Sequence, residues 1–360
     1  MRGGTSRGPF FLASDLPQDP LARDQVLLAV MGSPDRRQID GLGGAHPLTS
    51  KVGIVSRSST AGVDLDFLFA QLQPNSDKVD ITPNCGNMLA AVLPFALERG
   101  LLAIQDGVTS ARILTLNTGM QCDVTVVTPQ GRLQYGGDAR IDGVPGTAAP
   151  VKINFLETAG SVCSAMLPTG NVLDQISFPL AAGGSMQVGA TLIDNGMPMV
   201  LIKASDFSIS GTESVVELNA NLTLRAKLEA LRLVAGERMG LGDVAAKNYP
   251  KMCLIAAPKA GGAIATRCFI PHVCHEAIGV LAAVTVATAC VLPGSIADGL
   301  AHCEAGLQKT LSVEHPTGEF SVELELDGDD KTKIARAALL RTARPIMRGE
   351  VLIPADVWRD

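Results

Sequence analysis

The stretch Asn87-Met-Leu-Ala-Ala-Val92 has a close counterpart in the second half of the chain, Gly279-Val-Leu-Ala-Ala-Val284. Each stretch opens an apolar run, and these runs end near Gly100 and Gly294. Further matches follow in the same order along both halves: Gly8–Leu16 with Met199–Phe207, Thr49–Val55 with Tyr249–Ile255, and Asn117–Gly119 with Pro316–Gly318. Short matches that keep a fixed order over a whole chain predict an internal duplication.

Each half shows the pattern strand, helix, strand, buried helix, hairpin. Alternating runs predict strands, and apolar or amphipathic runs predict helices. The predicted strands include 112–116, 122–127 and 320–326, and the predicted helices include 88–99, 220–238 and 277–293. We therefore expect a mixed α/β (α+β) fold of two pseudo-symmetric lobes, 1–182 and 183–360, each a curved sheet around a buried helix. A ligand is expected in a cleft between two such copies.

Composition excludes several classes of function. The 360 residues are 46% hydrophobic but only 4% aromatic, with a net charge of -6 and no Lys/Arg-rich run, so we expect no nucleic-acid partner. No apolar run reaches the roughly 18 residues that a membrane span needs. The eight cysteines show no disulfide-framework spacing and no apolar signal segment opens the chain, which predicts a reducing, cytoplasmic location.

The segment Thr82-Pro-Asn-Cys-Gly-Asn-Met88 carries the first candidate chemistry. A cysteine at a helix N-terminus feels the positive end of the helix dipole, which favours its thiolate. The backbone N–H groups of Gly86, Asn87 and Met88 could hold a carboxylate or an enolate oxygen. The alternative is that Asn84 or Asn87 only caps the helix and that Cys85 is a small buried residue.

A second segment, 38–52, contains Thr49-Ser-Lys51 and lacks the Gly-Lys-Ser/Thr order of a phosphate loop. Lys51 stands at the entry of the apolar strand 52–55, where partial burial would fit its amine for proton abstraction; the alternative is a solvated turn lysine.

The third segment, Met1-Arg-Gly-Gly-Thr-Ser-Arg-Gly8, combines glycines with hydroxyl and guanidinium groups suited to carboxylates, although a flexible terminus would have the same composition.

The fourth segment is Arg267-Cys-Phe-Ile-Pro-His-Val-Cys-His275. Its cysteines and histidines invite a zinc hydrolase interpretation, but their spacing matches no usual ligand pair and no second pair follows. By the repeat, this loop corresponds to the Cys85 loop, and Ala277 takes the place of Cys85. We therefore expect unequal chemistry from the two lobes and no metal site.

The first three segments, with Pro250-Lys-Met252 and His315-Pro-Thr-Gly318, resemble the motifs of the PrpF-type isomerases, and the resemblance covers nearly the whole chain. The resemblance implies a diaminopimelate epimerase-like fold and no cofactor. The family's catalytic lysine and cysteine fall on Lys51 and Cys85. Epimerases of this fold use a cysteine from each lobe, and Ala277 excludes that arrangement here. Family members usually carry a short strand before the Met-Arg-Gly-Gly segment, so we expect either an upstream start or a missing edge strand.

The resemblance implies an isomerase or tautomerase that moves a proton by a 1,3-allylic shift in an unsaturated polycarboxylate. The expected substrate is 4-oxalomesaconate of gallate- or protocatechuate-type aromatic catabolism. Isomerisation of 2-methylaconitate or methylitaconate is the alternative within the class, and a non-catalytic carboxylate-binding protein is the alternative outside it. The sequence does not decide whether the protein forms a homodimer. It also does not decide whether Lys51 or Cys85 is the initial base. The predicted substrate-binding residues are Arg2, Thr5, Ser6, Ser50, Asn84, Gly86, Asn87, Met88, Lys251, Arg267 and His275.

Overall fold

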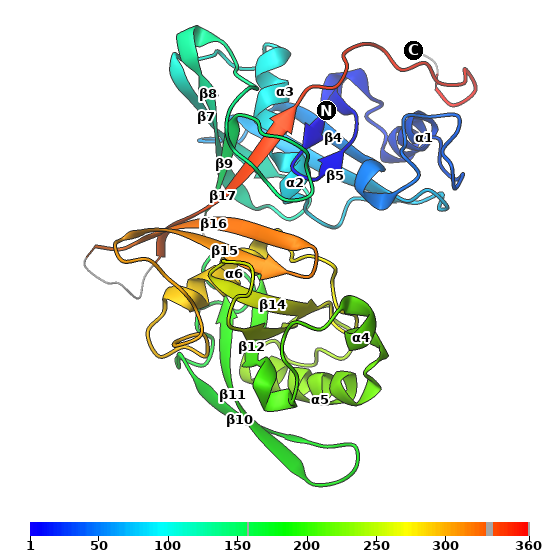
Figure 1. Cartoon of the computed structure of the whole chain (residues 1–360). Helices are drawn as coiled ribbons and strands as arrows, with labels where there is room; N and C mark the ends of the chain where they lie inside the picture. Colours follow the sequence, from blue (N-terminus) through cyan, green and yellow to red (C-terminus); the bar gives the residue numbers. More distant parts are fainter. Residues whose placement is uncertain (157, 329–333, 359–360) are drawn as a thin grey trace. The chain divides into compact units, whose positions relative to one another are not determined.

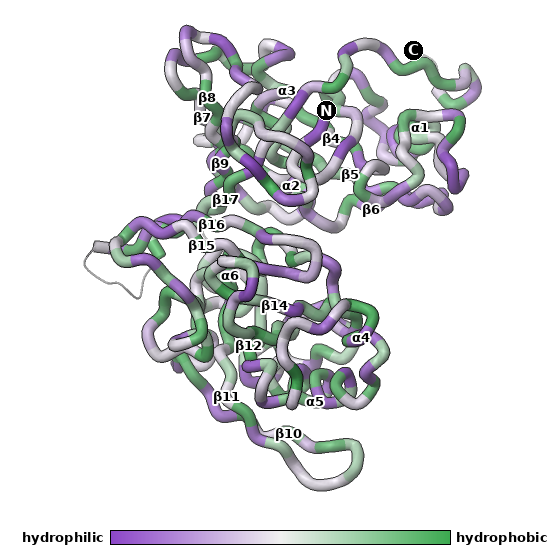
Figure 2. The backbone as a smooth tube through the Cα atoms, viewed as in Figure 1, coloured by the Kyte–Doolittle hydropathy of each residue, from purple (hydrophilic) through white to green (hydrophobic). Residues whose placement is uncertain are grey.

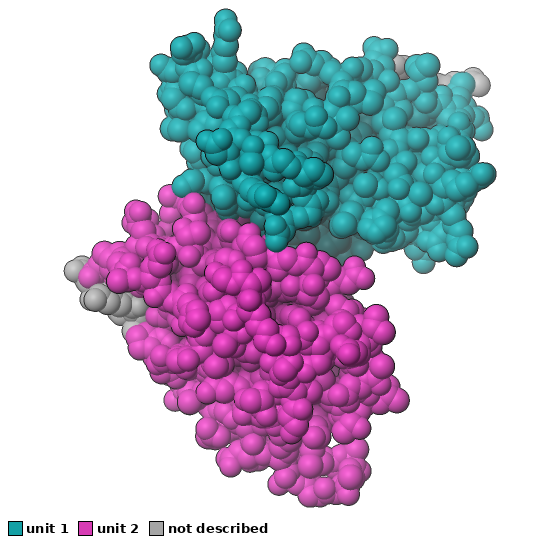
Figure 3. Space-filling model, in the orientation of Figure 1, with its two compact units in different colours: residues 1–156, 340–360 teal, residues 157–339 magenta. Residues whose placement is uncertain are grey.

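The computed structural model describes residues 1–156, 158–328 and 334–358 (Figure 1). It divides into two compact units, coloured in Figure 3: unit 1 is Met1–Leu156 with Leu340–Asp360, and unit 2 is Glu157–Leu339. The predicted boundary at 182/183 differs from this division. It falls in the turn between β10 (Asp174–Pro179) and β11 (Ser185–Asp194), which pair residue by residue and so belong to one unit.

The elements of unit 1 alternate between short strands and short helices along the chain. Its strands are β1 (Arg2–Gly3), β2 (Ser6–Arg7), β3 (Phe10–Leu12), β4 (Lys51–Arg57), β5 (Leu65–Leu72), β6 (Val79–Asp80), β7 (Gly107–Thr115), β8 (Gln121–Thr128) and β9 (Pro150–Phe155). Its helices are α1 (Pro20–Met31), α2 (Gly86–Leu89) and α3 (Val92–Glu98), with 3-10 turns at Ala13–Asp15, Pro47–Thr49 and Pro129–Gly131.

Unit 2 continues from the β10–β11 hairpin. Its remaining elements are β12 (Pro198–Lys203), a 3-10 turn (Ala204–Phe207), α4 (Val215–Ala220), α5 (Leu222–Arg238), β13 (Lys251–Ala256), β14 (Ile264–Phe269), α6 (Val280–Val291), β15 (Gln308–His315) and β16 (Gly318–Leu326). The last strand, β17 (Ile334–Arg344), pairs with β16 through its first half and with β1 through Ala343 and Arg344.

The two units have the same order of strand pairings. In unit 1, β3 pairs with β4 in parallel, β4 with β5 antiparallel, β5 with β7 in parallel, and β7 with β8 antiparallel. In unit 2 the same sequence runs through β12, β13, β14, β15 and β16. The registers also correspond, because Phe11 pairs with Ile54 and Ile202 pairs with Leu254. An internal duplication predicts this repetition of registers.

Each sheet packs on a buried helix, and the predicted α/β fold class is confirmed. Residues 92–97 of α3 are buried and the helix contacts β4 and β8, while α6 is buried along residues 282–290 and contacts β11, β12, β15 and β16. The predicted helix 277–293 is thus confirmed. The predicted continuous helix 88–99 is wrong, because the chain forms α2 and α3 with a break at Ala90 and Ala91. Pro94 has no N–H to donate to the carbonyl of Ala90, which explains the break.

Local patterns account for the other elements that the sequence predicted. Buried and partly exposed residues alternate along β8, and Figure 2 colours the backbone by the hydropathy of each residue. The predicted amphipathic helix 220–238 is α5, which begins after the Asn221 cap and contacts β10 and β13. In unit 1, α1 buries Leu27 and Met31, and Trp358 packs against this cluster. None of the helices that the structure describes is long and apolar enough to cross a membrane.

Candidate active site

The glycines of the N-terminal segment let it lie against the two segments predicted to carry catalysis. A Cβ atom on Gly8 would lie 1.7 Å from the carbonyl oxygen of Lys51 and 3.4 Å from the terminal methyl of Met88. Gly4 has a φ of +51°, and a Cβ there would lie 2.0 Å from Oδ1 of Asn87. The close approach therefore requires glycine. The N-terminal, Lys51 and Cys85 segments meet in unit 1, as the sequence motifs predict.

Lys51 is the first residue of β4, and only 7% of it is exposed. Its Nζ donates a hydrogen bond to Oε1 of Gln71 at 2.5 Å and lies 5.0 Å from the centroid of the Phe69 ring. Within the part of the chain that the structure describes, no ion pair involves Lys51. The amine is thus buried against neutral partners, which excludes the alternative of a solvated turn lysine.

Ser50 supports Lys51 from the preceding position. Its side chain is fully buried, and its hydroxyl lies 2.9 Å from both Oε1 of Gln38 and the carbonyl oxygen of His46. Gln38 also accepts a hydrogen bond from the backbone N–H of Ala45 at 2.8 Å. These bonds close the glycine-rich loop onto the start of β4. Ser50 has acceptors for its hydroxyl within the protein, and its predicted contact with substrate stays a prediction.

Cys85 is the N-cap residue of α2, with a free, partly buried thiol. Its carbonyl oxygen accepts a hydrogen bond from the N–H of Leu89 at 2.9 Å. The helix begins at Gly86, two residues earlier than predicted, and it is only one turn long. Because the macrodipole grows from aligned peptide units, its effect on Cys85 is smaller than a continuous helix over 88–99 would give.

Polar side chains with unused hydrogen-bonding capacity surround these segments. Nδ2 of Asn84 lies 2.5 Å from Oγ1 of Thr118, and Nδ2 of Asn87 lies 3.0 Å from Oγ1 of Thr5. The Oδ1 atoms of both asparagines and Oγ of Ser6 are buried without a hydrogen-bond partner among the residues described. Since a threonine hydroxyl both donates and accepts, each amide can turn either its oxygen or its NH₂ toward a ligand. Unsatisfied buried polar atoms are rare and suit a ligand-binding site.

The Arg2 side chain has partners within unit 1. Its Nη1 donates to the carbonyl oxygens of Gly4 and Thr342, at 2.8 and 3.0 Å, and lies 3.0 Å from Oγ1 of Thr342. Burial and the nearby Arg344 lower the pKa of Arg2. Arg2 therefore fastens β17 to the N-terminal segment, and its contact with a carboxylate stays a prediction.

Four residues that the motifs did not identify contact the candidate residues or support them. Phe69 and Gln71 contact the Lys51 amine, Asn117 is hydrogen-bonded to Phe69, and Thr118 is hydrogen-bonded to Asn84. The first two lie on β5 opposite β4, a long-range pairing that no local pattern reveals. Asn117 and Thr118 lie in the turn between β7 and β8, and the sequence used them only as a marker of the repeat. In unit 2 the corresponding Thr317 donates to the carbonyl oxygen of Glu276 at 2.8 Å, as the duplication would predict.

The predicted substrate-binding residues of the second half lie in unit 2. Lys251 opens β13, and burial lowers its pKa. Arg267 is 8% exposed, and its guanidinium donates to the carbonyl oxygens of Glu213 and Thr266, both at 2.8 Å. His275 is exposed, and its Nδ1 accepts from the N–H of Ala277 at 2.9 Å. Their binding of substrate stays a prediction.

The cysteines and histidines of the 267–275 segment point to different partners. The Sγ atoms of Cys268 and Cys253 lie 3.1 Å apart on paired strands, whereas Nδ1 of His272 lies 3.3 Å from Oε2 of Glu229. Among residues 1–156, 158–328 and 334–358, no three His, Cys, Asp or Glu side chains are grouped so that they could hold a metal ion.

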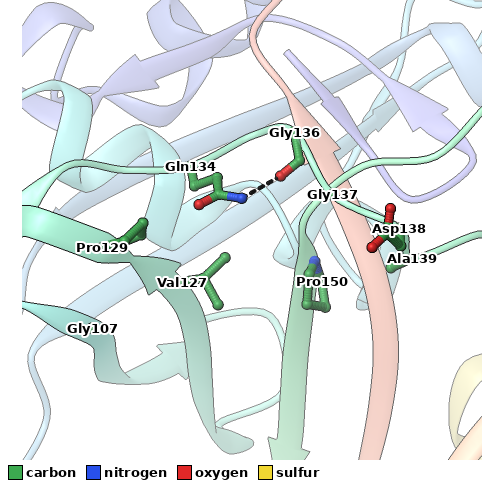
Figure 4. A pocket seen from close by; sticks show the side chains of 9 residues that line it. All are labelled: Gly107, Val127, Pro129, Gln134, Gly136, Gly137, Asp138, Ala139 and Pro150. Atoms are coloured by element: carbon green, nitrogen blue, oxygen red, sulfur yellow. Dashed lines mark hydrogen bonds between the residues drawn. The ribbon is translucent and has the colours of Figure 1, made fainter.

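A separate surface pocket of about 440 Å³ lies at one end of β7–β9 (Figure 4). Gln134 donates to the carbonyl oxygen of Gly136 at 2.7 Å beside it, and Asp138 contributes its one charged side chain. Its other lining residues are Gly107, Val127, Pro129, Gly137, Ala139 and Pro150. None of the predicted site residues lines this pocket, so we do not assign the reaction to it.

Comparisons with known proteins cover the chain almost completely. The family model described as PrpF protein matches residues 1–354. The chain is 54% identical over 353 residues to the (4E)-oxalomesaconate Delta-isomerase of Novosphingobium sp. (strain KA1), covering 98% of this chain and 96% of that one. It is 51% identical over 358 residues to the 4-oxalomesaconate tautomerase of Pseudomonas putida KT2440, with 99% and 96% covered. The crystal structure of a methylitaconate-delta-isomerase matches with a TM-score of 0.84 at 33% identity, covering 97% and 92%.

Proposed function

Because this chain belongs to the PrpF family and is an isomerase, we propose that it catalyses a 1,3-allylic proton shift in 4-oxalomesaconate. Two relatives at 54% and 51% identity that carry this substrate in their names support the choice over methylated aconitates or itaconates. The single observation that carries the chemistry is the Lys51 amine, which is buried against a neutral amide and an aromatic ring. The backbone of Lys51 and the side chain of Met88, in the Cys85 segment, both lie against Gly8.

The reaction uses two proton carriers and needs no co-reactant. One of Lys51 and Cys85 takes a proton from the carbon next to the double bond, so that a C–H bond breaks and its electron pair spreads into a dienolate. The other carrier delivers a proton to the far carbon of that system, and the double bond has then moved by one position.

The binding groups proposed for the substrate carboxylates and the enolate oxygen come mainly from unit 1. Ser6, Asn84 and Asn87 have buried oxygens without partners, and Thr5 holds the amide of Asn87. The N–H groups of Gly86 and Met88 at the start of α2 would complete the set. Arg2, Ser50, Lys251, Arg267 and His275 stay in the proposal on the strength of the sequence motifs.

We also propose a cytoplasmic location. All eight cysteines are free in the structure, although Cys253 and Cys268 have sulfur atoms only 3.1 Å apart. A cysteine pair this close could form a disulfide bond in an oxidising compartment, so its free thiols support the proposed location.

A substrate comparison tests the proposal. The purified protein is assayed with 4-oxalomesaconate, 2-methylaconitate and methylitaconate, and we expect kcat/KM for the first to exceed the others by at least about tenfold. A higher kcat/KM for a methylated substrate would reassign the substrate within the family. Binding of all three without turnover would instead favour a non-catalytic carboxylate-binding protein.

A further inference from the structure

Both the oxygen and the NH₂ group of the Gln71 amide have hydrogen-bond partners, and these partners fix its orientation. It lies directly opposite Lys51 in the β4–β5 pair. Its Oε1 accepts from Nζ of Lys51 at 2.5 Å. Its Nε2 faces the carbonyl oxygens of Leu72, Pro47 and Ser50 at 2.8, 3.0 and 3.2 Å. The two N–H bonds of the amide thus meet three backbone acceptors, two from the segment that precedes Lys51 and one from β5.

This arrangement excludes the flipped amide. Turning the amide by 180° would place its oxygen against three carbonyl oxygens and its NH₂ against the lysine amine, so that acceptors would face acceptors and donors would face donors. The backbone around Lys51 therefore determines that an oxygen, and a neutral one, points at Nζ. Glutamate in this place would face the same three carbonyls with a negative oxygen, and it would hold the amine in an ion pair.

The second unit supplies an internal comparison. Lys251 opens β13 as Lys51 opens β4, and among the residues that the structure describes its Nζ has no hydrogen-bond partner. In the described part of the chain the amide tether therefore stands beside Lys51 and has no counterpart at Lys251.

We propose that Gln71 is a positioning residue for Lys51, because its neutral amide oxygen holds the buried amine in place. The proposal rests on the proposed role of Lys51 in proton transfer. It explains why a polar side chain stands at this position of β5.

A double-mutant cycle tests the proposal. We expect Gln71→Met, which keeps the length of the side chain but removes its amide, to lower kcat by about 10²-fold, the usual cost of a small misplacement of a reacting group, with KM changed less than about threefold. Gln73→Met is the matched control, because Gln73 lies two residues further on and is exposed. In a Lys51→Met background, Gln71→Met should lower the residual kcat by less than about twofold, since Gln71 acts through Lys51.

Equal losses in both backgrounds, or no loss in the wild-type background, would overturn the proposal and give Gln71 a merely structural role. Crystal structures of the wild type and Gln71→Met keep the test decisive where residual activity is too low to measure. The proposal expects Nζ of Lys51 to move by more than about 1 Å, the scale of misplacement that costs rate, and an unmoved Nζ would contradict it. If Lys51→Met alone keeps full turnover, the proposed role of Lys51 in proton transfer fails, while the position of Nζ still decides whether Gln71 holds the amine.

Discussion

The side chain of Asn117 is hydrogen-bonded to both backbone groups of Phe69: its Oδ1 accepts from the N–H at 2.9 Å, and its Nδ2 donates to the carbonyl oxygen at 2.8 Å. The same Nδ2 lies 2.6 Å from the carbonyl oxygen of Ile81, in the segment that leads to Cys85. One amide thus joins the strand whose Phe69 ring packs on the Lys51 amine to the loop that carries the thiol. The turn between β7 and β8 is therefore part of the support of both catalytic candidates.

We predict that Asn117→Ala lowers the free energy of unfolding by about 1–3 kcal/mol, because it leaves the N–H and carbonyl groups of Phe69 without their partner. Urea denaturation measures this change. The kcat should fall as well, by roughly tenfold or more, because both catalytic candidates lose a common support. Asn75→Ala, at an exposed position, is the control. Unchanged stability together with unchanged kcat would show that the Asn117 bridge has no role in the site.

Removal of either proposed proton carrier should lower turnover while the fold is kept. We predict that Lys51→Met and Cys85→Ser each reduce kcat by on the order of 10²–10⁴, the usual contribution of a general acid or base. Circular dichroism and the melting temperature check the fold. Cys303→Ser, which changes an exposed thiol, should leave kcat within about twofold of the wild type, as is usual for surface substitutions.

The Cys85→Ser variant tests the proton-transfer mechanism more cleanly than the Lys51→Met variant does. Lys51 is buried and bonded to Gln71, so its loss also disturbs packing, whereas Cys85 is partly exposed at a helix N-cap. A Cys85→Ser variant with wild-type turnover would remove the thiol from the mechanism.

Glu314 gives unit 2 a predictable dependence of stability on pH. Burial raises its pKa, but hydrogen bonds from the backbone N–H groups of Lys259, Gly262 and Ala260, at 2.9, 2.8 and 2.7 Å, lower it more, so the pKa lies below its usual value of 4.5. A carboxylate with a depressed pKa stabilises the folded state above the unfolded-state pKa, and this contribution is lost as the pH falls through the folded-state pKa.

We therefore predict that the free energy of unfolding decreases as the pH is lowered below about 4.5, and that Glu314→Gln makes this decrease shallower. Urea denaturation at a series of pH values measures the slope. The matched control is Glu237→Gln, an exposed position on α5, which should keep the wild-type slope. A slope that Glu314→Gln leaves unchanged would contradict the role assigned to this carboxylate.

The sequence predicted those helices and strands that form because of the pattern of their own residues. The uncharged run around Ala282–Cys290 became the buried helix α6, and the alternating run of 122–127 became β8. The break before α3 also has a local cause in Pro94, which the apolar pattern of 88–99 obscured. The resemblance implied that Lys51 and Cys85 act together, and in the structure Gly8 lies against both the carbonyl oxygen of Lys51 and the side chain of Met88.

The remaining features depend on pairings between distant residues. Gln71 is one polar residue in the strand Leu65–Leu72, and only the β4–β5 register places it opposite Lys51. The unit boundary depends on the β10–β11 hairpin and on the return of β17 to β1, neither of which the internal matches mark. Periodicity along one strand does not specify its partner, so these features needed the structure.

The fate of the transferred proton tests the central claim most directly, because the claim is that two different carriers, Lys51 and Cys85, handle it. A lysine ammonium carries three equivalent protons and a partly exposed thiol exchanges with solvent, so the abstracted proton should be diluted before redelivery. In D₂O we predict that nuclear magnetic resonance of the product shows deuterium at the accepting carbon, on one face only. Product without deuterium at any carbon, or with deuterium on both faces of that carbon, would contradict the two-carrier mechanism.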